Sequence, residues 1–168
     1  MTRFYFDASA LVKRYYVERG SQVVNDIFHR VPKDRMMSLL LGAGEIISVL
    51  VRRRNDGSIS SETYTKAVSQ IRREVLMPGE FVLESATDEL VQRSFAFIDP
   101  YSINATDAVV LRSALDASEA LRAQGETLVL VTADARLVRA AQAEGLTTFN
   151  PESDSSETLD ALAPTGGA

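Results

Sequence analysis

The sequence contains no cysteine and only one histidine, His29, among its 168 residues. The lack of cysteine excludes thiol catalysis, iron–sulfur clusters and cysteine-ligated zinc. A histidine-based zinc site and a Ser-His-Asp triad both depend on positioned imidazoles, so one histidine makes either a poor interpretation. We interpret His29 as a surface or core-edge residue. Any catalytic or metal-binding chemistry in this chain is therefore expected to use oxygen ligands.

Long apolar runs are also missing. The longest, from Met36 to Val51, is interrupted by Gly42, Gly44 and Glu45, and so falls short of the ~18 to 20 apolar residues that span a bilayer. The N-terminus shows no basic leader followed by an apolar core and a cleavage site. With 45% hydrophobic and 24% charged residues, the composition is that of one globular domain. We expect a cytoplasmic protein that does not cross a membrane.

Apolar segments of two periodicities alternate along the chain. Short runs typical of buried strands occur at 4–6, 36–41, 81–83, 127–131 and 146–149. Segments with helical spacing occur at 8–17, 21–30, 43–54, 61–77, 87–98, 104–123 and 135–143. This alternation predicts an α/β fold, a Rossmann-like parallel sheet of about five strands with helices on both faces. Residues 1–151 would form the domain, and 152–168 an acidic tail with one helical turn at 157–162.

Four carboxylates occupy positions where reactive groups gather in such folds. Asp7 follows the first strand, Asp134 lies just beyond the strand at 127–131, and Glu45 and Asp107 lie in the first turns of predicted helices. In open α/β sheets the functional crevice lies beyond the carboxyl ends of the strands. Asp7, Asp107 and Asp134 could instead serve only as helix caps. Glu45 stands alone in an uncharged stretch, where burial requires a partner or a raised pKa.

Four converging carboxylates would repel one another unless their pKa values rise or a divalent cation binds between them. Oxygen ligands without histidine or cysteine suit Mg²⁺ or Mn²⁺. Such an ion can activate water and stabilise the attacking and leaving oxygens at phosphorus. The pattern therefore indicates phosphodiester or phosphate hydrolysis.

The sequence resembles the PIN-domain ribonucleases, in particular the VapC-type toxins of toxin–antitoxin pairs. The motifs that carry the resemblance are Tyr5-Phe6-Asp7-Ala8-Ser9-Ala10-Leu11-Val12-Lys13-Arg14-Tyr15, Glu45, Thr106-Asp107-Ala108 and Val131-Thr132-Ala133-Asp134-Ala135-Arg136-Leu137, in the family's order over residues 3–151. Many relatives continue Asp-Ala-x-His-Leu-Ala after the third acid, whereas this chain reads Asp107-Ala108-Val109-Val110-Leu111-Arg112.

The resemblance implies a specific site and specific partners. Asp7, Glu45, Asp107 and Asp134 would be the catalytic, metal-binding acids, supported by Ser9 and Thr132. It also implies an Mg²⁺-dependent or Mn²⁺-dependent endoribonuclease, an RNA substrate, a homodimer and a small antitoxin that blocks the site.

Three other functions remain as alternatives. A haloacid-dehalogenase-type phosphohydrolase would also place Asp7 after the first strand, but it needs a second acid where Ser9 stands. A dinucleotide site at Gly42-Ala43-Gly44 lacks the third glycine, because Ile47 occupies that position. A PIN-like module that binds RNA or protein without cleaving it has the same fold, because fold does not determine function.

The basic residues suggest where RNA phosphates could bind. The candidate contacts are Lys13, Arg14, Arg52, Arg53 and Arg136, with Arg54, Arg72, Arg73 and Arg139 also available. The net charge of −5 at first argues against nucleic acid. However, the tail holds four acids and no base, so residues 1–150 carry 18 basic and 19 acidic side chains. Neutralisation of the four site acids by metal would leave an excess of positive charge, which is compatible with RNA.

Overall fold

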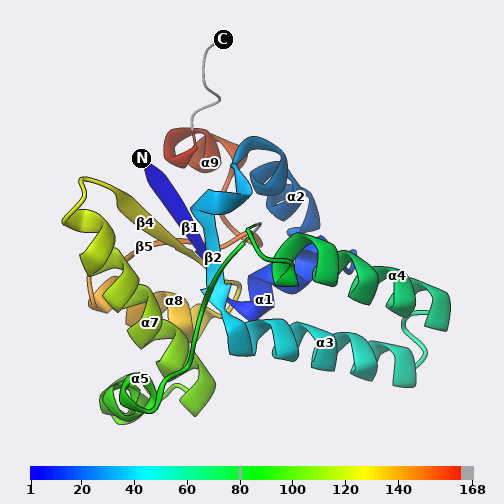
Figure 1. Cartoon of the computed structure of the whole chain (residues 1–168), viewed down its shortest axis with the longest axis horizontal. Coiled ribbons are helices and arrows are strands. Elements are labelled where there is room, and N and C mark those ends of the chain that lie inside the picture. Colours follow the sequence, from blue (N-terminus) through cyan, green and yellow to red (C-terminus); the bar gives the residue numbers. More distant parts are fainter. Residues whose placement is uncertain (80, 164–168) are drawn as a thin grey trace.

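A computed structural model describes residues 1–79 and 81–163. Its sheet consists of β1 (Thr2–Phe6), β2 (Met36–Leu39), β3 (Val82–Glu84), β4 (Thr127–Val131) and β5 (Thr147–Phe149). All neighbouring strands are parallel, and their order is β3-β2-β1-β4-β5, which places β1 at the centre (Figure 1). The predicted α/β fold with a five-stranded parallel sheet is confirmed.

Helices cover both faces of this sheet. They are α1 (Ala8–Leu11), α2 (Ser21–Arg30), α3 (Leu40–Asn55), α4 (Ser61–Ile71), α5 (Asp88–Ser94), α6 (Ile98–Tyr101), α7 (Ala105–Arg122), α8 (Ala135–Ala143) and α9 (Ser156–Leu162). Residues of α1 to α4 and α9 pack in one core cluster, and residues of α6, α7 and α8 in the other, with α5 against it. Figure 1 shows α3 and α4 extending to one side of the sheet and α5 and α7 lying on the other.

The central strand divides its side chains between these two cores. Phe4 and Phe6 join the cluster under α1 to α4, while Tyr5 joins the cluster under α7 and donates its hydroxyl to Ser113 Oγ at 2.8 Å. This alternation is the period of two that a strand imposes. Because parallel strands are buried on both faces, all three aromatic side chains are at most 1% exposed. These residues are core, as the sequence indicated.

The predicted strand at 36–41 is too long by two residues. β2 ends at Leu39, whose backbone is still extended, and α3 begins at Leu40. Leu40 and Leu41 are 48% and 49% exposed on the first turn of the helix. Their apolar side chains continued the strand pattern in the sequence although they lie on a helix surface. As a result, Glu45 lies in the second turn of α3 and not in the first.

The predicted helix at 8–17 is also wrong in its second half. α1 ends at Leu11, a 3₁₀ turn covers Val12–Arg14, and residues 15–20 form a loop. The apolar spacing continued because Tyr15 is buried, at 7% exposed, on non-helical backbone. Burial, and not helical geometry, produced that part of the pattern.

The described part of the acidic segment, up to residue 163, packs against the domain. Its helix α9 buries Leu159 in the same core cluster as Phe4, and Asp160 pairs with Arg30 of α2. Gly20, at φ +86°, lies so close to Pro151 that a Cβ would stand 2.7 Å from the Pro151 carbonyl oxygen. Residues 164–168 of the predicted tail lie outside the described residues. The division at residue 151 stays a prediction.

Candidate active site

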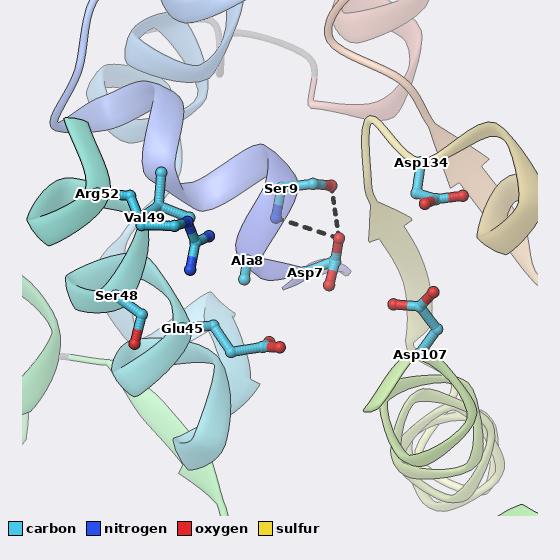
Figure 2. Close-up of a pocket in the computed structure, with 9 residues that line it drawn as sticks. All are labelled: Asp7, Ala8, Ser9, Glu45, Ser48, Val49, Arg52, Asp107 and Asp134. Atoms are coloured by element: carbon cyan, nitrogen blue, oxygen red, sulfur yellow. Dashed lines mark hydrogen bonds between the residues drawn. The ribbon is translucent and has the colours of Figure 1, made fainter. Parts of the chain in front are cut away.

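A cavity of about 410 Å³ opens at the carboxyl ends of β1, β2 and β4. All four carboxylates predicted from the sequence line it. The complete lining is Asp7, Ala8, Ser9, Glu45, Ser48, Val49, Arg52, Asp107 and Asp134. Figure 2 shows the side chains arriving from α1, α3, α7 and the loop before α8 and facing a common space. The crevice expected from the parallel sheet is therefore present, and the carboxylates occur together in it.

Asp7 is fixed at the centre of this cavity through only one of its two carboxylate oxygens. Its Oδ2 accepts hydrogen bonds from Ser9 N at 3.2 Å, Ser9 Oγ at 2.5 Å and Thr132 Oγ1 at 3.0 Å. Thr132 is fully buried, and its hydroxyl also accepts the backbone N–H of Asp134 at 3.1 Å. Within the described residues, Oδ1 of Asp7 has no hydrogen bond. Ser9 and Thr132 thus hold one oxygen and leave the other for a ligand.

Asp134 and Asp107 are also held in the fold through one carboxylate oxygen each. Asp134 Oδ1 caps α8 by accepting from Arg136 N at 2.7 Å and Leu137 N at 3.1 Å. Asp107 Oδ2 accepts from the Asn104 side-chain amide at 2.8 Å, while Asn104 caps α7 by accepting from Asp107 N. In the described structure, the second oxygen of each carboxylate has no hydrogen bond. The helix-capping and ligand-binding interpretations of these residues are therefore compatible, because each uses a different oxygen.

Glu45 is the fourth carboxylate and the only one on a long side chain. No hydrogen bond to its carboxylate is found among the described residues. Burial raises its pKa, the charge of Asp7 raises it further, and the charge of Arg52 lowers it. The raised pKa of this half-buried acid is one of the outcomes that its isolated position in the sequence indicated.

The strongest sign of uncompensated charge is at Asp107. Burial and then the carboxylates of Asp7, Asp134 and Glu45 raise the pKa of Asp107 to about 7, against a smaller opposing contribution from Arg136. The other three carboxylates thus oppose ionisation of Asp107, and a divalent cation would relieve this repulsion.

The donor set fits a hard cation that keeps part of its hydration shell. In the described part of the chain, no group of three or more Asp, Glu or His side chains is arranged to hold an ion directly. Mg²⁺ usually retains several waters and binds proteins through one or two carboxylates. The free oxygens of Asp7 and its neighbours can supply such a small set, either directly or through bound water.

The raised pKa of Asp107 predicts how stability changes with pH in the absence of metal. A folded-state pKa of about 7, against about 3.9 in the unfolded chain, means that stability is lost as the pH rises between these values. Asp107→Asn removes the ionisation. In EDTA at pH 8, we expect the variant to be more stable by about 1 kcal/mol, a figure reduced for solvent screening, and this advantage to disappear near pH 4.

Thermal unfolding followed by circular dichroism measures this difference. Glu119→Gln is the matched control, because Glu119 is an exposed acid of the same helix. If Asp107→Asn were more stable than the parent by the same amount at pH 4 and at pH 8, ionisation of Asp107 would not be the cause of the difference.

Two of the predicted RNA contacts have other roles in the structure. Lys13 is only 3% exposed, and its ammonium pairs with Glu18 at 2.8 Å and Glu152 at 2.5 Å. Arg14 forms a two-pronged ion pair with Glu74 at 2.9 and 3.1 Å, and its guanidinium lies over the ring of Phe28. Both side chains are engaged in ion pairs within the fold, and their contact with RNA stays a prediction.

The remaining candidates point in different directions. Arg52 lines the cavity. Arg53 lies over the ring of Tyr16, at 5.1 Å from its centroid. Arg136 is exposed beside the site, and its charge lowers the pKa of Asp107.

The cavity also includes Ser48 and Val49, which were not predicted from the sequence. Their signal was the spacing of 45, 48, 49 and 52, which places four residues on one helix face.

Solved structures with the same architecture give this site its context. A scan of family models and a search of curated proteins give no match to the sequence. One similar structure is PAE2754 from Pyrobaculum aerophilum, with 18% identity and a TM-score of 0.57, covering 97% of this chain and 98% of that one. A second is the sarcin-ricin loop cleaving toxin VapC20 from Mycobacterium tuberculosis, with 15% identity and a TM-score of 0.58, covering 86% of this chain and 96% of that one. A third is a toxin–antitoxin complex from Klebsiella pneumoniae, with 17% identity and a TM-score of 0.56, covering 88% of this chain and 96% of that one.

The similarity extends over nearly the whole of each neighbour, while the sequence identities are low. These neighbours are PIN-domain proteins, among them toxins of toxin–antitoxin systems. Helices long and apolar enough to cross a membrane do not occur in the described residues. The five-stranded parallel sheet and the helices that flank it match these neighbours, so this chain has the PIN-domain fold.

Proposed function

We propose that this protein is an Mg²⁺-dependent or Mn²⁺-dependent endoribonuclease that acts as the toxin of a toxin–antitoxin pair. The observation that carries the proposal is the cavity with four carboxylates. In three of them, one oxygen is engaged in the fold and the other has no hydrogen bond to residues 1–79 or 81–163. The neighbouring VapC20 structure, described as a toxin that cleaves the sarcin-ricin loop, supports the same reaction class.

In this proposal the residues of the cavity have two roles, binding the cation and orienting the carboxylates that bind it. Asp7, Glu45, Asp107 and Asp134 would hold the cation, which supplies an activated water and stabilises charge on the phosphate oxygens when bound. Ser9 and Thr132 orient Asp7 through the hydrogen bonds to Oδ2. Asn104 orients Asp107 in the same way. Outer hydrogen bonds of this kind typically contribute 10–100-fold to metal affinity or activity.

The proposed partners follow from the same neighbours. A toxin–antitoxin complex is among the similar structures, so we propose a small antitoxin that binds this chain and covers the cavity. We also propose a homodimer that acts on RNA in the cytoplasm.

Two alternatives are less well supported by the geometry. A haloacid-dehalogenase-type mechanism would need an acid at position 9, but Ser9 is a hydrogen-bond donor to Asp7. A module that binds RNA without cleaving it would not require four carboxylates in one cavity, where burial and then the charges of the other three raise the pKa of Asp107. Cleavage therefore remains the preferred function.

Metal addition tests the proposal in two ways. At a Mg²⁺ concentration ten times Kd, we expect about 1.4 kcal/mol of added stability from preferential binding to the folded state, or a rise of roughly 3–5 °C in the melting temperature. The same Mg²⁺ should be required for cleavage of single-stranded RNA, which EDTA should abolish.

The control for the melting experiment is Glu45→Gln, which removes one of the four charges from the cavity. A rise equal to that of the parent would mean that the ion binds elsewhere. RNA that stays intact with Mg²⁺ and with Mn²⁺ would overturn the nuclease assignment and favour the module that binds without cleaving.

A further inference from the structure

Among the described residues, one cation lines the carboxylate cavity, the exposed side chain of Arg52. It is seven residues after Glu45 on α3, and Ser48 and Val49 lie between them on the same helix face. Side chains on a helix tilt toward its N-terminus, so Arg52 reaches back toward Glu45. Figure 2 shows its guanidinium pointing into the cavity from the α3 side, with Asp107 and Asp134 on the opposite side. The cavity therefore has a carboxylate-rich end and a cationic end.

The side chain of Arg52 is unpaired even though carboxylates are near. No hydrogen bond or ion pair to its guanidinium is found among the described residues, although its charge acts on Glu45. The next two arginines of the same helix are engaged elsewhere. Arg53 lies over Tyr16 and within 4.0 Å of Glu18, and Arg54 lies over Tyr64 at 4.5 Å. Of these three consecutive arginines, Arg52 is the one available to a ligand in the cavity.

An anion that also associates with a metal ion would satisfy both ends of the cavity. A cation at the carboxylates removes their attraction for Arg52 and leaves the guanidinium free. Guanidinium groups bind phosphate oxygens through two parallel N–H donors, which makes arginine well suited to backbone phosphates. Between the two ends, Val49 offers an apolar surface to a sugar. The Ser48 hydroxyl donates to the Gly44 carbonyl at 3.0 Å, so its oxygen can accept a hydrogen bond from a sugar hydroxyl. A polymer with one phosphate at each end and a sugar between them matches this order.

We propose that Arg52 binds the RNA phosphate next to the one at the carboxylates, with the intervening sugar against Val49. This proposal rests on the proposed nuclease function and makes α3 the element that sets where the RNA backbone leaves the site. Arg52 is then a substrate-binding residue, whereas Arg53 and Arg54 belong to the surface of the fold.

A binding experiment with chemically altered RNA tests the assignment. The probe is a fluorescent single-stranded oligoribonucleotide bound in Ca²⁺, with its integrity checked on a gel, and the proteins are the parent, Arg52→Gln, Arg52→Lys and Arg54→Gln. We expect Arg52→Gln to bind about tenfold more weakly, as for loss of one charge-assisted contact. Its log–log salt slope should fall by about 0.7, the value for one phosphate of a single strand. Arg52→Lys should recover part of the affinity, and Arg54→Gln should bind like the parent.

The second arm locates the phosphate. A series of probes carries one uncharged methylphosphonate at successive positions around the cleavage site. A methylphosphonate at the phosphate next to the scissile one should weaken binding of the probe to the parent about tenfold. The same probe should bind Arg52→Gln no more weakly than the unmodified RNA does.

The outcomes separate this inference from the proposed function. If the parent binds and cleaves RNA but Arg52→Gln binds as tightly as Arg54→Gln, the phosphate subsite is wrong and the nuclease stands. The phosphate subsite is also wrong if every methylphosphonate position weakens binding to Arg52→Gln as much as it weakens binding to the parent. If the parent neither binds nor cleaves RNA, the nuclease function itself is wrong. Equal melting temperatures of the three variants and the parent show that the comparison reports binding and not folding.

Discussion

Replacing Asp7 by asparagine is expected to reduce RNA cleavage by about a thousandfold or more. Asp7 lies between Glu45, Asp107 and Asp134, and its charge contributes to the raised pKa values of two of them. The variant keeps the shape of the side chain but removes the charge that would hold the cation. Metal-ion catalysis contributes several kcal/mol of transition-state stabilisation, and each 1.36 kcal/mol corresponds to a factor of ten in rate. Initial rates on a fluorescent RNA in Mg²⁺ measure the loss.

Two controls accompany this variant. Glu119→Gln changes an exposed acid of α7 away from the cavity and should cleave at the parental rate. Ser9→Ala retains the charge of Asp7 but removes the hydroxyl donor to its Oδ2, so a loss of about 10–100-fold is expected. If Asp7→Asn folds normally and cleaves as fast as the parent, the carboxylate cavity is not the catalytic site.

The second large effect is expected on stability, at Lys13. This ammonium is almost completely buried between Glu18 and Glu152. Lys13→Met preserves the length of the side chain but leaves two carboxylates without their partner. Breaking a buried ion pair from one side costs about 3–5 kcal/mol, and the partial exposure of the two glutamates reduces this to roughly 2–3 kcal/mol. The melting temperature should therefore fall by about 4–12 °C, as measured by calorimetry.

Lys66→Met provides the matched control. Lys66 pairs with Glu62 at 2.6 Å, but both side chains are about three-quarters exposed, and such pairs contribute roughly 0–1 kcal/mol. If Lys13→Met melts like Lys66→Met and instead binds RNA more weakly, Lys13 belongs to the RNA surface, as the sequence first indicated.

The carboxylates of the cavity could be predicted from the sequence because each one is recognisable from the residues next to it in the chain. Asp7 and Asp134 end strands that are recognisable from their apolar runs, and each caps the helix that follows. Glu45 was recognisable because no other charge lies near it in the sequence. In a parallel sheet, strand ends share one edge, so local signals were enough to bring these residues together.

The directions of the basic side chains could not be predicted in this way. Lys13 and Arg14 follow Asp7 closely in the sequence, but a 3₁₀ turn after α1 directs them toward Glu152 and Glu74, which are distant in the sequence. Along α3, each residue is rotated by about 100° from the last, so neighbouring arginines face different surroundings. Arg53 and Arg54 lie over Tyr16 and Tyr64, whereas Arg52 lines the cavity, and these tertiary positions cannot be read from the sequence.

The hydrogen bond between Thr132 and Asp7 joins residues 125 positions apart in the sequence, so the carboxylate cavity can form only late in synthesis. β1 is made first, but its neighbour β4 and the threonine that orients Asp7 are translated only after most of the chain. At about 5–20 residues per second, the segment between them takes roughly 6–25 s to emerge. Asp7 therefore lacks this hydrogen bond until most of the chain has been made, and the carboxylate cavity is complete only once Asp134 has been added.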